Sequence, residues 1–174
     1  DCQRYDAAGK PLGIETLVNT ATTGNQKDAT VAVDDDGDFV VVWEGDGDQV
    51  GQVDDKGVFF QRFNSAGVAQ GGEIRVNTTT ADDQKDAAVA MDADGDFVVV
   101  WESKGQDGDS NKESNIYFQR YDAAGNPLAI ETLVNTPTTG NHKDATVAVD
   151  DDGEFVVVLV GDGDRLAQVD ARVV

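Results

Sequence analysis

The chain has 174 residues, of which 34 are acidic and 13 are basic, so its formal net charge is −21. A surface this negative repels phosphate groups, which excludes nucleic acid and anionic membrane surfaces as expected partners. No apolar run reaches the ~18–20 residues of a membrane-spanning helix, and a single cysteine excludes an intrachain disulfide framework.

The sequence repeats every 58 residues without a gap. A Gln-Arg-aromatic motif lies at residues 3–6 and returns at 61–64 and 119–122. Residues 3–40 and 119–156 differ at only five positions. A period of this length indicates one repeat domain over the whole chain. Its units are residues 1–58, 59–116 and 117–174.

Each unit contains four short segments of β character, which we name strands A to D. They are rich in Val, Ile, Phe, Tyr and Thr, and clusters of Gly, Asp and Asn separate them, which is typical of strands joined by tight turns. No segment has the apolar periodicity of a helix. The sequence therefore predicts an all-β fold, with the strands of the middle unit at residues 87–92, 97–102, 116–121 and 130–136.

Four antiparallel strands per unit predict β-propeller blades, with a β-repeat fibre or solenoid as the alternative. Complete blades are expected at about 28–78 and 86–136. Residues 1–20 supply strands C and D without A and B, and residues 144–160 supply the reverse. Three blades are too few for a ring, which has roughly four to eight. We therefore expect the two ends to combine between chains, as a six-bladed dimer or a longer head-to-tail array.

The motifs QRYDAAGNPL, VNT and DGDFVVVW together resemble tandem β-propeller-type repeats of large secreted and surface proteins of bacteria. The strand order also resembles that of a sialidase-type propeller, in which an apolar strand, an Asp-Gly turn and a second apolar strand open each blade. The resemblance implies an extracellular or cell-surface location. It also implies calcium-binding modules as frequent neighbours of such repeats.

An active site needs a singular set of residues, and near-identical units place their carboxylates in near-identical surroundings. His142 is the only histidine; it aligns with Gln26 and Gln84 and is expected in a polar loop. Cys2 aligns with packed aromatic residues. The sequence therefore predicts no catalytic residue and no enzymatic activity.

Acidic residues recur in the loop between strands B and C, where they alternate with other residues in the middle unit. Calcium takes roughly six to eight oxygen ligands in irregular geometry, and alternating acidic side chains on a loop supply them. The alternative is a solvated acidic loop that favours solubility. The predicted calcium ligands are Asp107, Asp109, Asn111 and Glu113, with Asp46, Asp48, Asp162 and Asp164 in the other units.

A Lys–Asp pair enters strand A in each unit, at Lys27-Asp28, Lys85-Asp86 and Lys143-Asp144. In a propeller this end of strand A lies at the rim of the central channel, where ligands bind. We predict that the pairs bind a polar ligand such as a carbohydrate; the alternative is a salt bridge between blades. Asn77 begins an Asn-Thr-Thr sequon and is a candidate glycosylation site, with a structural role as the favoured alternative.

The main functional hypothesis is a non-catalytic extracellular module for binding or adhesion, stabilised by calcium. One alternative is a structural subunit of a surface layer or filament, assembled head-to-tail from copies of itself. A second alternative is a glycosidase-like enzyme. Discrete oligomers favour the first, open-ended polymers the second, and turnover of a glycoside the third. The expected partners are other copies of the chain and a carbohydrate.

Overall fold

The computed structural model describes residues 1–20, 24–46, 56–108, 113–136, 140–161 and 168–173. Within these ranges the regular structure consists of strands, and no helix there is long and apolar enough to cross a membrane. The predicted all-β fold with four-stranded antiparallel sheets is confirmed.

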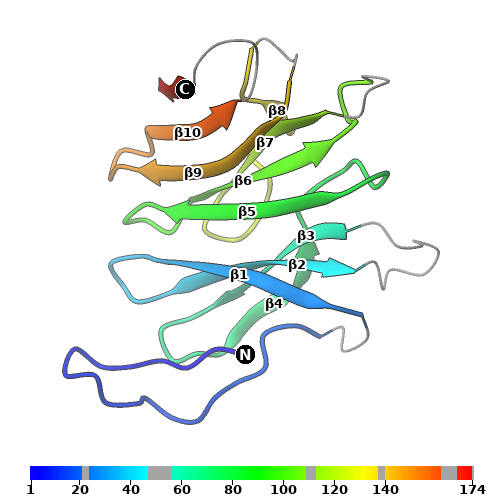
Figure 1. The fold of residues 1–174 in the computed structure, drawn as a ribbon. Helices are drawn as coiled ribbons and strands as arrows, with labels where there is room; N and C mark the ends of the chain where they lie inside the picture. Colours follow the sequence, from blue (N-terminus) through cyan, green and yellow to red (C-terminus); the bar gives the residue numbers. More distant parts are fainter. Residues whose placement is uncertain (21–23, 47–55, 109–112, 137–139, 162–167, 174) are drawn as a thin grey trace.

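Two four-stranded sheets follow each other along the chain, and a three-stranded sheet comes last (Figure 1). The strands of each sheet lie in sequence order, which is the meander of a propeller blade. The first blade contains β1 (Gln26–Val33), β2 (Phe39–Asp46), β3 (Lys56–Phe63) and β4 (Ala69–Arg75). The second contains β5 (Gln84–Met91), β6 (Phe97–Lys104), β7 (Ser114–Tyr121) and β8 (Thr132–Leu133). The third contains β9 (His142–Val149), β10 (Phe155–Gly161) and β11 (Gln168–Val173).

The hairpin between the first two strands of each blade closes through the same aspartate-containing turn. In the first blade the Asp38 N–H donates to the Asp34 carboxylate at 2.9 Å, and the Gly37 N–H donates to the Asp34 carbonyl at 3.2 Å. Gly37 has a φ of 83°, a left-handed conformation that glycine adopts without steric cost. The Asp and Gly positions in the sequence therefore set this turn.

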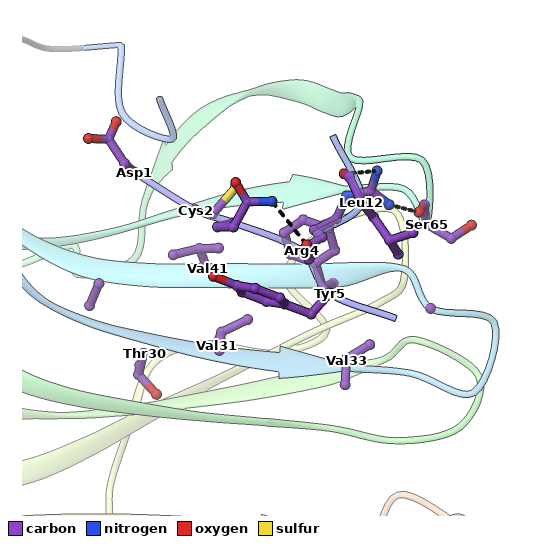
Figure 2. Close-up of a pocket in the computed structure, with 14 residues that line it drawn as sticks. Asp1, Cys2, Arg4, Tyr5, Leu12, Thr30, Val31, Val33, Val41 and Ser65 are labelled. Atoms are coloured by element: carbon purple, nitrogen blue, oxygen red, sulfur yellow. Dashed lines mark hydrogen bonds between the residues drawn. The ribbon is translucent and has the colours of Figure 1, made fainter. Parts of the chain in front are cut away.

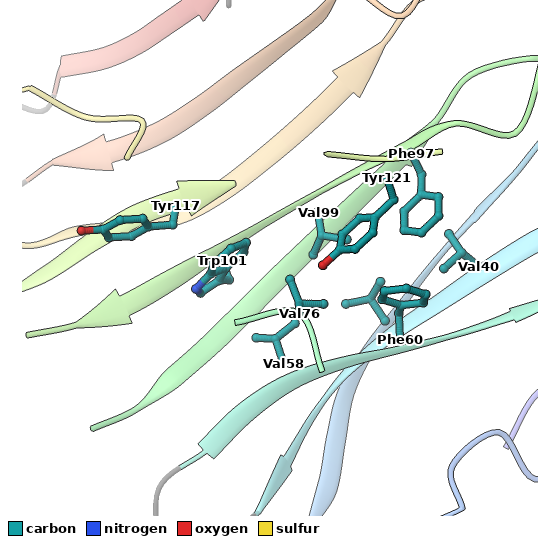
Figure 3. Packing of buried hydrophobic residues seen from close by; sticks show 10 residues of the cluster. Val40, Val58, Phe60, Val76, Phe97, Val99, Trp101, Tyr117 and Tyr121 are labelled. Atoms are coloured by element: carbon teal, nitrogen blue, oxygen red, sulfur yellow. The ribbon is translucent and has the colours of Figure 1, made fainter. Parts of the chain in front are cut away.

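Strands β2 and β6 are buried on both faces, because each lies between two layers of the molecule. Trp43 and Trp101 lie on these strands and are 3% and 0% exposed, as the sequence predicts. Figure 3 shows the packing between the first two blades, where Val40 and Phe60 meet Phe97. The same positions build a second cluster between the second and third blades, made of Val98, Val100, Ile116, Phe118, Val134, Phe155, Val157 and Leu159.

Polar contacts between the first two blades accompany this packing. The Arg62 guanidinium, on β3, donates to the carbonyl of Ala123, in the turn that follows β7. The Thr78 N–H, which follows β4, donates to the Glu131 carboxylate of the second blade at 2.9 Å. Successive blades are therefore held together by polar contacts at their edges as well as by apolar contacts in the interior.

Residues 1–20 occupy the place that β3 and β4 would have in a preceding blade. The Arg4 guanidinium donates to the Ser65 carbonyl, and the Thr20 N–H donates to Glu73 at 2.9 Å. These contacts have the same sequence separations as those between the first and second blades. The N-terminal segment is therefore docked on the first blade in the way that one blade docks on the next.

Strand β11 pairs with β10 in a register that departs from the repeat. In the first blade Val40 lies opposite Arg62, whereas in the third blade Val156 lies opposite Val173. If β11 followed the register of the first blade, Val156 would lie opposite a residue five positions further along the sequence than Val173. The free edge of β10 is therefore covered by a strand that is not equivalent to β3 or β7.

Candidate functional site

The three Lys–Asp pairs lie at the start of β1, β5 and β9, strands that lie side by side in successive blades (Figure 1). The aspartates have φ angles of 52°, 50° and 52°, which are costly for residues other than glycine. Strand pairing is interrupted at each pair, and such bulges commonly re-aim a side chain towards a site. We name this row the Lys–Asp rim; it consists of Lys27-Asp28, Lys85-Asp86 and Lys143-Asp144.

A buried glutamate holds the lysine in each of the first two blades. Glu44 of β2 and Glu102 of β6 are 1% and 3% exposed. The Lys27 Nζ lies 3.2 Å from the Glu44 Oε2, and the Lys85 Nζ lies 3.0 Å from the Glu102 Oε2. Each lysine also contacts the aspartate that follows it. The buried carboxylate therefore has the cationic partner that a charge away from water needs.

The same glutamates connect each blade to the next. The Asp86 N–H donates to the Glu44 Oε1 at 2.6 Å, and the Asp144 N–H donates to the Glu102 Oε1 at 3.0 Å. One carboxylate thus binds a lysine of its own blade and the backbone of the strained aspartate in the next blade. The ion pairs lie within single blades. Neighbouring blades are connected here by a hydrogen bond, whereas the alternative interpretation of the sequence was a salt bridge between blades.

These carboxylates also set the protonation of the lysines. The hydrogen bonds to Asp28 and to the buried Glu44 raise the pKa of Lys27. Burial by itself lowers the pKa of Lys85, but its hydrogen bonds to the adjacent aspartate and to Glu102 outweigh burial, so this pKa lies above its ordinary value of 10.5. Both lysines are cations at neutral pH, so each pair presents hydrogen-bond donors and acceptors side by side.

The third blade departs from this arrangement at one position. Val160 stands where Glu44 and Glu102 stand in the other blades, and it lies opposite Lys143 across the strand pair. Among the described residues, Lys143 has no carboxylate within 4.0 Å. Asp144 therefore follows a lysine that no buried glutamate holds, and its surroundings differ from those of the other two aspartates.

A small cavity opens beside the first pair of the rim. Its volume is about 120 Å³, and its lining includes Lys27, Asp28, Asn19 and Trp43. Polar groups and an apolar wall thus meet in one concave place, the usual composition of a ligand site.

His142 is buried, and the prediction of a polar loop at this position is wrong. It is the first residue of β9, and its Nδ1 lies 3.3 Å from the amide nitrogen of Asn135. The equivalent Gln84 is the first residue of β5 and accepts a hydrogen bond from the Trp101 indole at 3.3 Å. Leu159 replaces this tryptophan in the third blade, so a different polar side chain fills the place of the glutamine. Strand β9 extends to His142 because the interior supplies Asn135 as a polar partner.

The predicted calcium ligands fall only partly within the described residues. Asp46 accepts the Asn25 N–H at 3.0 Å, and Asp107 accepts from the Asn115 amide at 3.0 Å. Glu113 accepts the Gly140 N–H at 2.7 Å. In the described ranges, no group of three or more His, Cys, Asp and Glu side chains is placed to hold a metal ion. Calcium binding stays a prediction, because these residues lie outside the described ranges: Asp48, Asp109, Asn111, Asp162 and Asp164.

Asn77 has a structural role at the end of the first blade. Its buried side chain accepts the Val58 N–H at 2.8 Å and donates to the Thr79 carbonyl at 2.6 Å. Asn135 makes the first of these contacts in the second blade, with the Ile116 N–H at 2.8 Å. Asn77 is 3% exposed, so a glycan on its amide nitrogen would meet buried surroundings, and glycosylation stays a prediction.

No protein-family model and no curated protein matches this sequence. Among solved structures, the fold is similar to that of an endo-arabinase from Bacteroides thetaiotaomicron VPI-5482, with a TM-score of 0.54, 12% identity, and coverage of 97% of this chain and 63% of that one. It is also similar to a Penicillium chrysogenum alpha-L-arabinanase complexed with arabinobiose, with a TM-score of 0.57, 12% identity, and coverage of 82% and 44%. The chain spans less than two thirds of the length of either structure.

Both structures are β-propeller glycoside hydrolases, so the propeller-type architecture is confirmed at the level of the fold. The main hypothesis from the sequence, a non-catalytic module for binding or adhesion, is corrected by this finding, which favours the glycosidase-like alternative. One premise of that hypothesis is also wrong in the structure. Near-identical units do not give identical surroundings, because Val160 removes a buried carboxylate from one of the three Lys–Asp pairs.

Proposed function

We propose that this chain forms part of a glycosidase-like propeller, which binds a polysaccharide at the Lys–Asp rim and hydrolyses its glycosidic bonds. The observation that carries the proposal is the row of three exposed aspartates, each at the same end of neighbouring strands and each with a positive φ. Strained backbone at polar, accessible residues is typical of functional sites. The names of the two similar structures make arabinan the first substrate to test.

The chemistry of the rim suits a carbohydrate. Lysine ammonium groups donate hydrogen bonds and aspartate carboxylates accept them, and a sugar hydroxyl does both. The cavity beside Lys27 and Asp28 adds an apolar wall at Trp43. The predicted extracellular or cell-surface location belongs to the same proposal, because a polysaccharide substrate lies outside the cell.

Glycoside hydrolysis needs a carboxylic acid that gives a proton to the leaving oxygen, and a carboxylate that activates water or attacks the anomeric carbon. The two roles require carboxyl groups in different surroundings. Asp86, which contacts the Lys85 ammonium group, is assigned as the carboxylate that activates water or attacks the anomeric carbon. Asp144 is assigned as the acid; its surroundings differ from those of Asp86, because Val160 stands in the place of the buried glutamate of its own blade.

The test is the release of reducing ends from arabinan and from a panel of other polysaccharides by the 174-residue chain. Asp86→Asn and Asp144→Asn should each lower the rate at least about 100-fold, because general acid–base catalysis supplies about 10²–10⁴-fold. Asp94→Asn is the matched control, since Asp94 is exposed in the turn at the opposite end of β5. No reducing ends from any polysaccharide, or unchanged rates in both rim variants, would contradict the proposal.

A further inference from the structure

A row of polar side chains leads from the second blade to the start of the third. The Asn115 amide nitrogen donates to the Asp107 carboxylate at 3.0 Å, and the Asn135 amide nitrogen donates to the Asn115 side-chain oxygen at 2.7 Å. The Asn135 nitrogen also lies 3.3 Å from the Nδ1 of His142, the first residue of β9. Asn115, Asn135 and His142 are all buried, so little water reaches their contacts. We name these four residues the Asn–His network.

The direction of each hydrogen bond in the Asn–His network is fixed by its neighbours. The Ile116 N–H donates to the Asn135 Oδ1 at 2.8 Å, so the Asn135 nitrogen faces Asn115 and His142. An amide nitrogen only donates, so the His142 Nδ1 has to accept. An imidazole nitrogen accepts only when it carries no proton. The network therefore requires the neutral ring, with its hydrogen on Nε2.

The residues that build this network depart from the repeat. Gly57 stands at the position of Asn115 in the first blade, and it has no side chain to join a network. Gln26 and Gln84 stand at the position of His142, and a glutamine side chain does not titrate. The junction of the second and third blades therefore combines a buried titratable ring with an asparagine that orients its partner, and the equivalent positions of the other units have neither.

We propose that His142 is a proton-sensitive contact between the second and third blades. The neutral ring accepts from Asn135 and fixes the start of β9 on the second blade. A proton on Nδ1 makes this nitrogen a donor that faces the Asn135 donor, in a place where little water separates them. The charged ring then has to move out of the interior, and the first residues of β9 detach from the second blade. The inference rests on hydrogen-bond directions and stands apart from the proposed hydrolysis.

The groups around His142 do not offer a protonated ring an anionic partner. Within the described ranges, no carboxylate oxygen lies within 4.0 Å of its ring nitrogens. Strand β10, which pairs with β9, has no titratable side chain along Phe155–Gly161. Glu102 of β6 already binds Lys85 and the Asp144 N–H. The charged and titratable side chains at this end of β9, of the strands β5, β6 and β7 packed against it, and of the adjoining described loops are Lys85, Asp86, Glu102, Lys104, Asp107, Glu113, Tyr117, Glu131, Lys143 and Asp144.

Contacts between the other units use groups that do not titrate near neutral pH. The Arg4 guanidinium donates to the Ser65 carbonyl (Figure 2), and the Arg62 guanidinium donates to the Ala123 carbonyl. Arginine keeps its proton in proteins, and a backbone carbonyl takes none. Histidine is the only side-chain type that ordinarily titrates between about pH 5 and 8, and His142 is the only histidine of the chain. Mild acid should therefore loosen the junction of the second and third blades selectively.

Nitrogen-15 NMR of the imidazole measures the protonation of the ring directly, on the chain without a histidine affinity tag. Because the chain has a single histidine, the two nitrogen signals belong to His142. At about pH 7.5 the Nδ1 should carry no proton and the Nε2 should carry one. The opposite tautomer, an average of the two tautomers, or a doubly protonated ring at this pH would overturn the proposal.

The pH dependence of stability is the second measurement, with His142→Gln as the matched variant, because glutamine stands at this position in the other units. The unfolded chain binds a proton that the folded network excludes, so this contribution to stability is present above about pH 6.5 and is lost as the pH falls. The unfolding equilibrium constant of the wild type, relative to His142→Gln, should rise by up to about tenfold per pH unit below about pH 6.5. A ratio that stays constant from about pH 5 to 8 would indicate a merely structural histidine and would overturn the proposal.

Hydrogen exchange tests whether the change is confined to one junction. The Asp144 N–H lies two residues after His142 and donates to a buried glutamate of the second blade, and the Asp86 N–H makes the equivalent hydrogen bond between the first two blades. Between about pH 7 and 5.5, the protection factor of Asp144 should fall in the wild type and stay constant in His142→Gln. That of Asp86 should stay constant in both. An equal fall at Asp86 and Asp144, or an undiminished fall in His142→Gln, would contradict the proposal.

Discussion

Removing the Glu102 carboxylate should separate two contributions to the junction of the second and third blades. Its Oε1 accepts the Asp144 N–H at 3.0 Å, and its Oε2 lies 3.0 Å from the Lys85 Nζ. A hydrogen bond to a charged group contributes about 1.5–3 kcal/mol. The Lys85 side chain is 31% exposed, so its ion pair is screened and we take it as about 0.5–1 kcal/mol. Glu102→Ala should therefore lower the free energy of unfolding by about 2–4 kcal/mol.

The companion variant Glu102→Gln keeps an oxygen that accepts the Asp144 N–H and loses only the charge. Its expected loss is about 1.5–2.5 kcal/mol, which is the ion pair together with the difference between a charged and a neutral acceptor for the Asp144 N–H. Glu154→Ala is the control, because Glu154 is exposed in a turn of the third blade and should change stability by less than about 0.5 kcal/mol. Urea unfolding followed by tryptophan fluorescence reports on this junction, since Trp101 precedes Glu102 on β6.

The difference in the free energy of unfolding between the wild type and Glu102→Gln should depend on pH in a defined direction. The pKa of Lys85 is raised in the folded chain, so the stability that its charge contributes is fully present below the ordinary lysine pKa of 10.5. It is lost as the pH rises through the higher pKa of the folded state. The gap between the wild type and Glu102→Gln should be constant from about pH 7 to 9 and should narrow only in strong alkali. If Glu102→Ala and Glu102→Gln destabilise no more than Glu154→Ala, the carboxylate does not join the blades and the reasoning is refuted.

Trp101→Ala should cost about 3–5 kcal/mol in urea unfolding, because the side chain is fully buried between blades, and Trp43→Ala should cost a similar amount. Burial raises the pKa values of Tyr117 and Tyr121, so in a spectrophotometric titration both should stay protonated above pH 10 until the chain unfolds; ionisation near pH 10 without unfolding would contradict their burial. Millimolar calcium should raise the melting temperature and EDTA should lower it, and Asp107→Asn should reduce that response; equal melting temperatures in calcium and EDTA would favour the solvated-loop alternative.

The sequence predicts the blades well, because the features that define them are local. The spacing of Asp34 and Gly37 sets a turn, the Val-rich runs form the central strands, and the 58-residue period repeats both. Burial of Trp43 and Trp101 follows from the same reasoning, since a strand that is apolar on both faces must lie between two layers.

The candidate site is predicted only in part. The Lys–Asp pairs are visible in the sequence, but the roles of Glu44 and Glu102 are not, because each binds a residue 42 positions away in the next blade. The positive φ of Asp28 is equally hidden, since no glycine or asparagine marks the bulge. His142 is misplaced because its polarity predicts a loop, whereas the fold buries it beside Asn135.

The contacts between blades have constant sequence separations: 42 residues from Asp86 to Glu44 and from Asp144 to Glu102, and 61 residues from Arg4 to Ser65 and from Arg62 to Ala123. Each of these four contacts, all between described residues, joins one unit to the next. Inserting or deleting a whole 58-residue unit at a junction would therefore leave each remaining contact with a partner of the same kind. Gene duplication and recombination can change the length of such an array in single steps, and the folded product needs no compensating substitution. Selection can then act on the number of units separately from the identity of the residues within them.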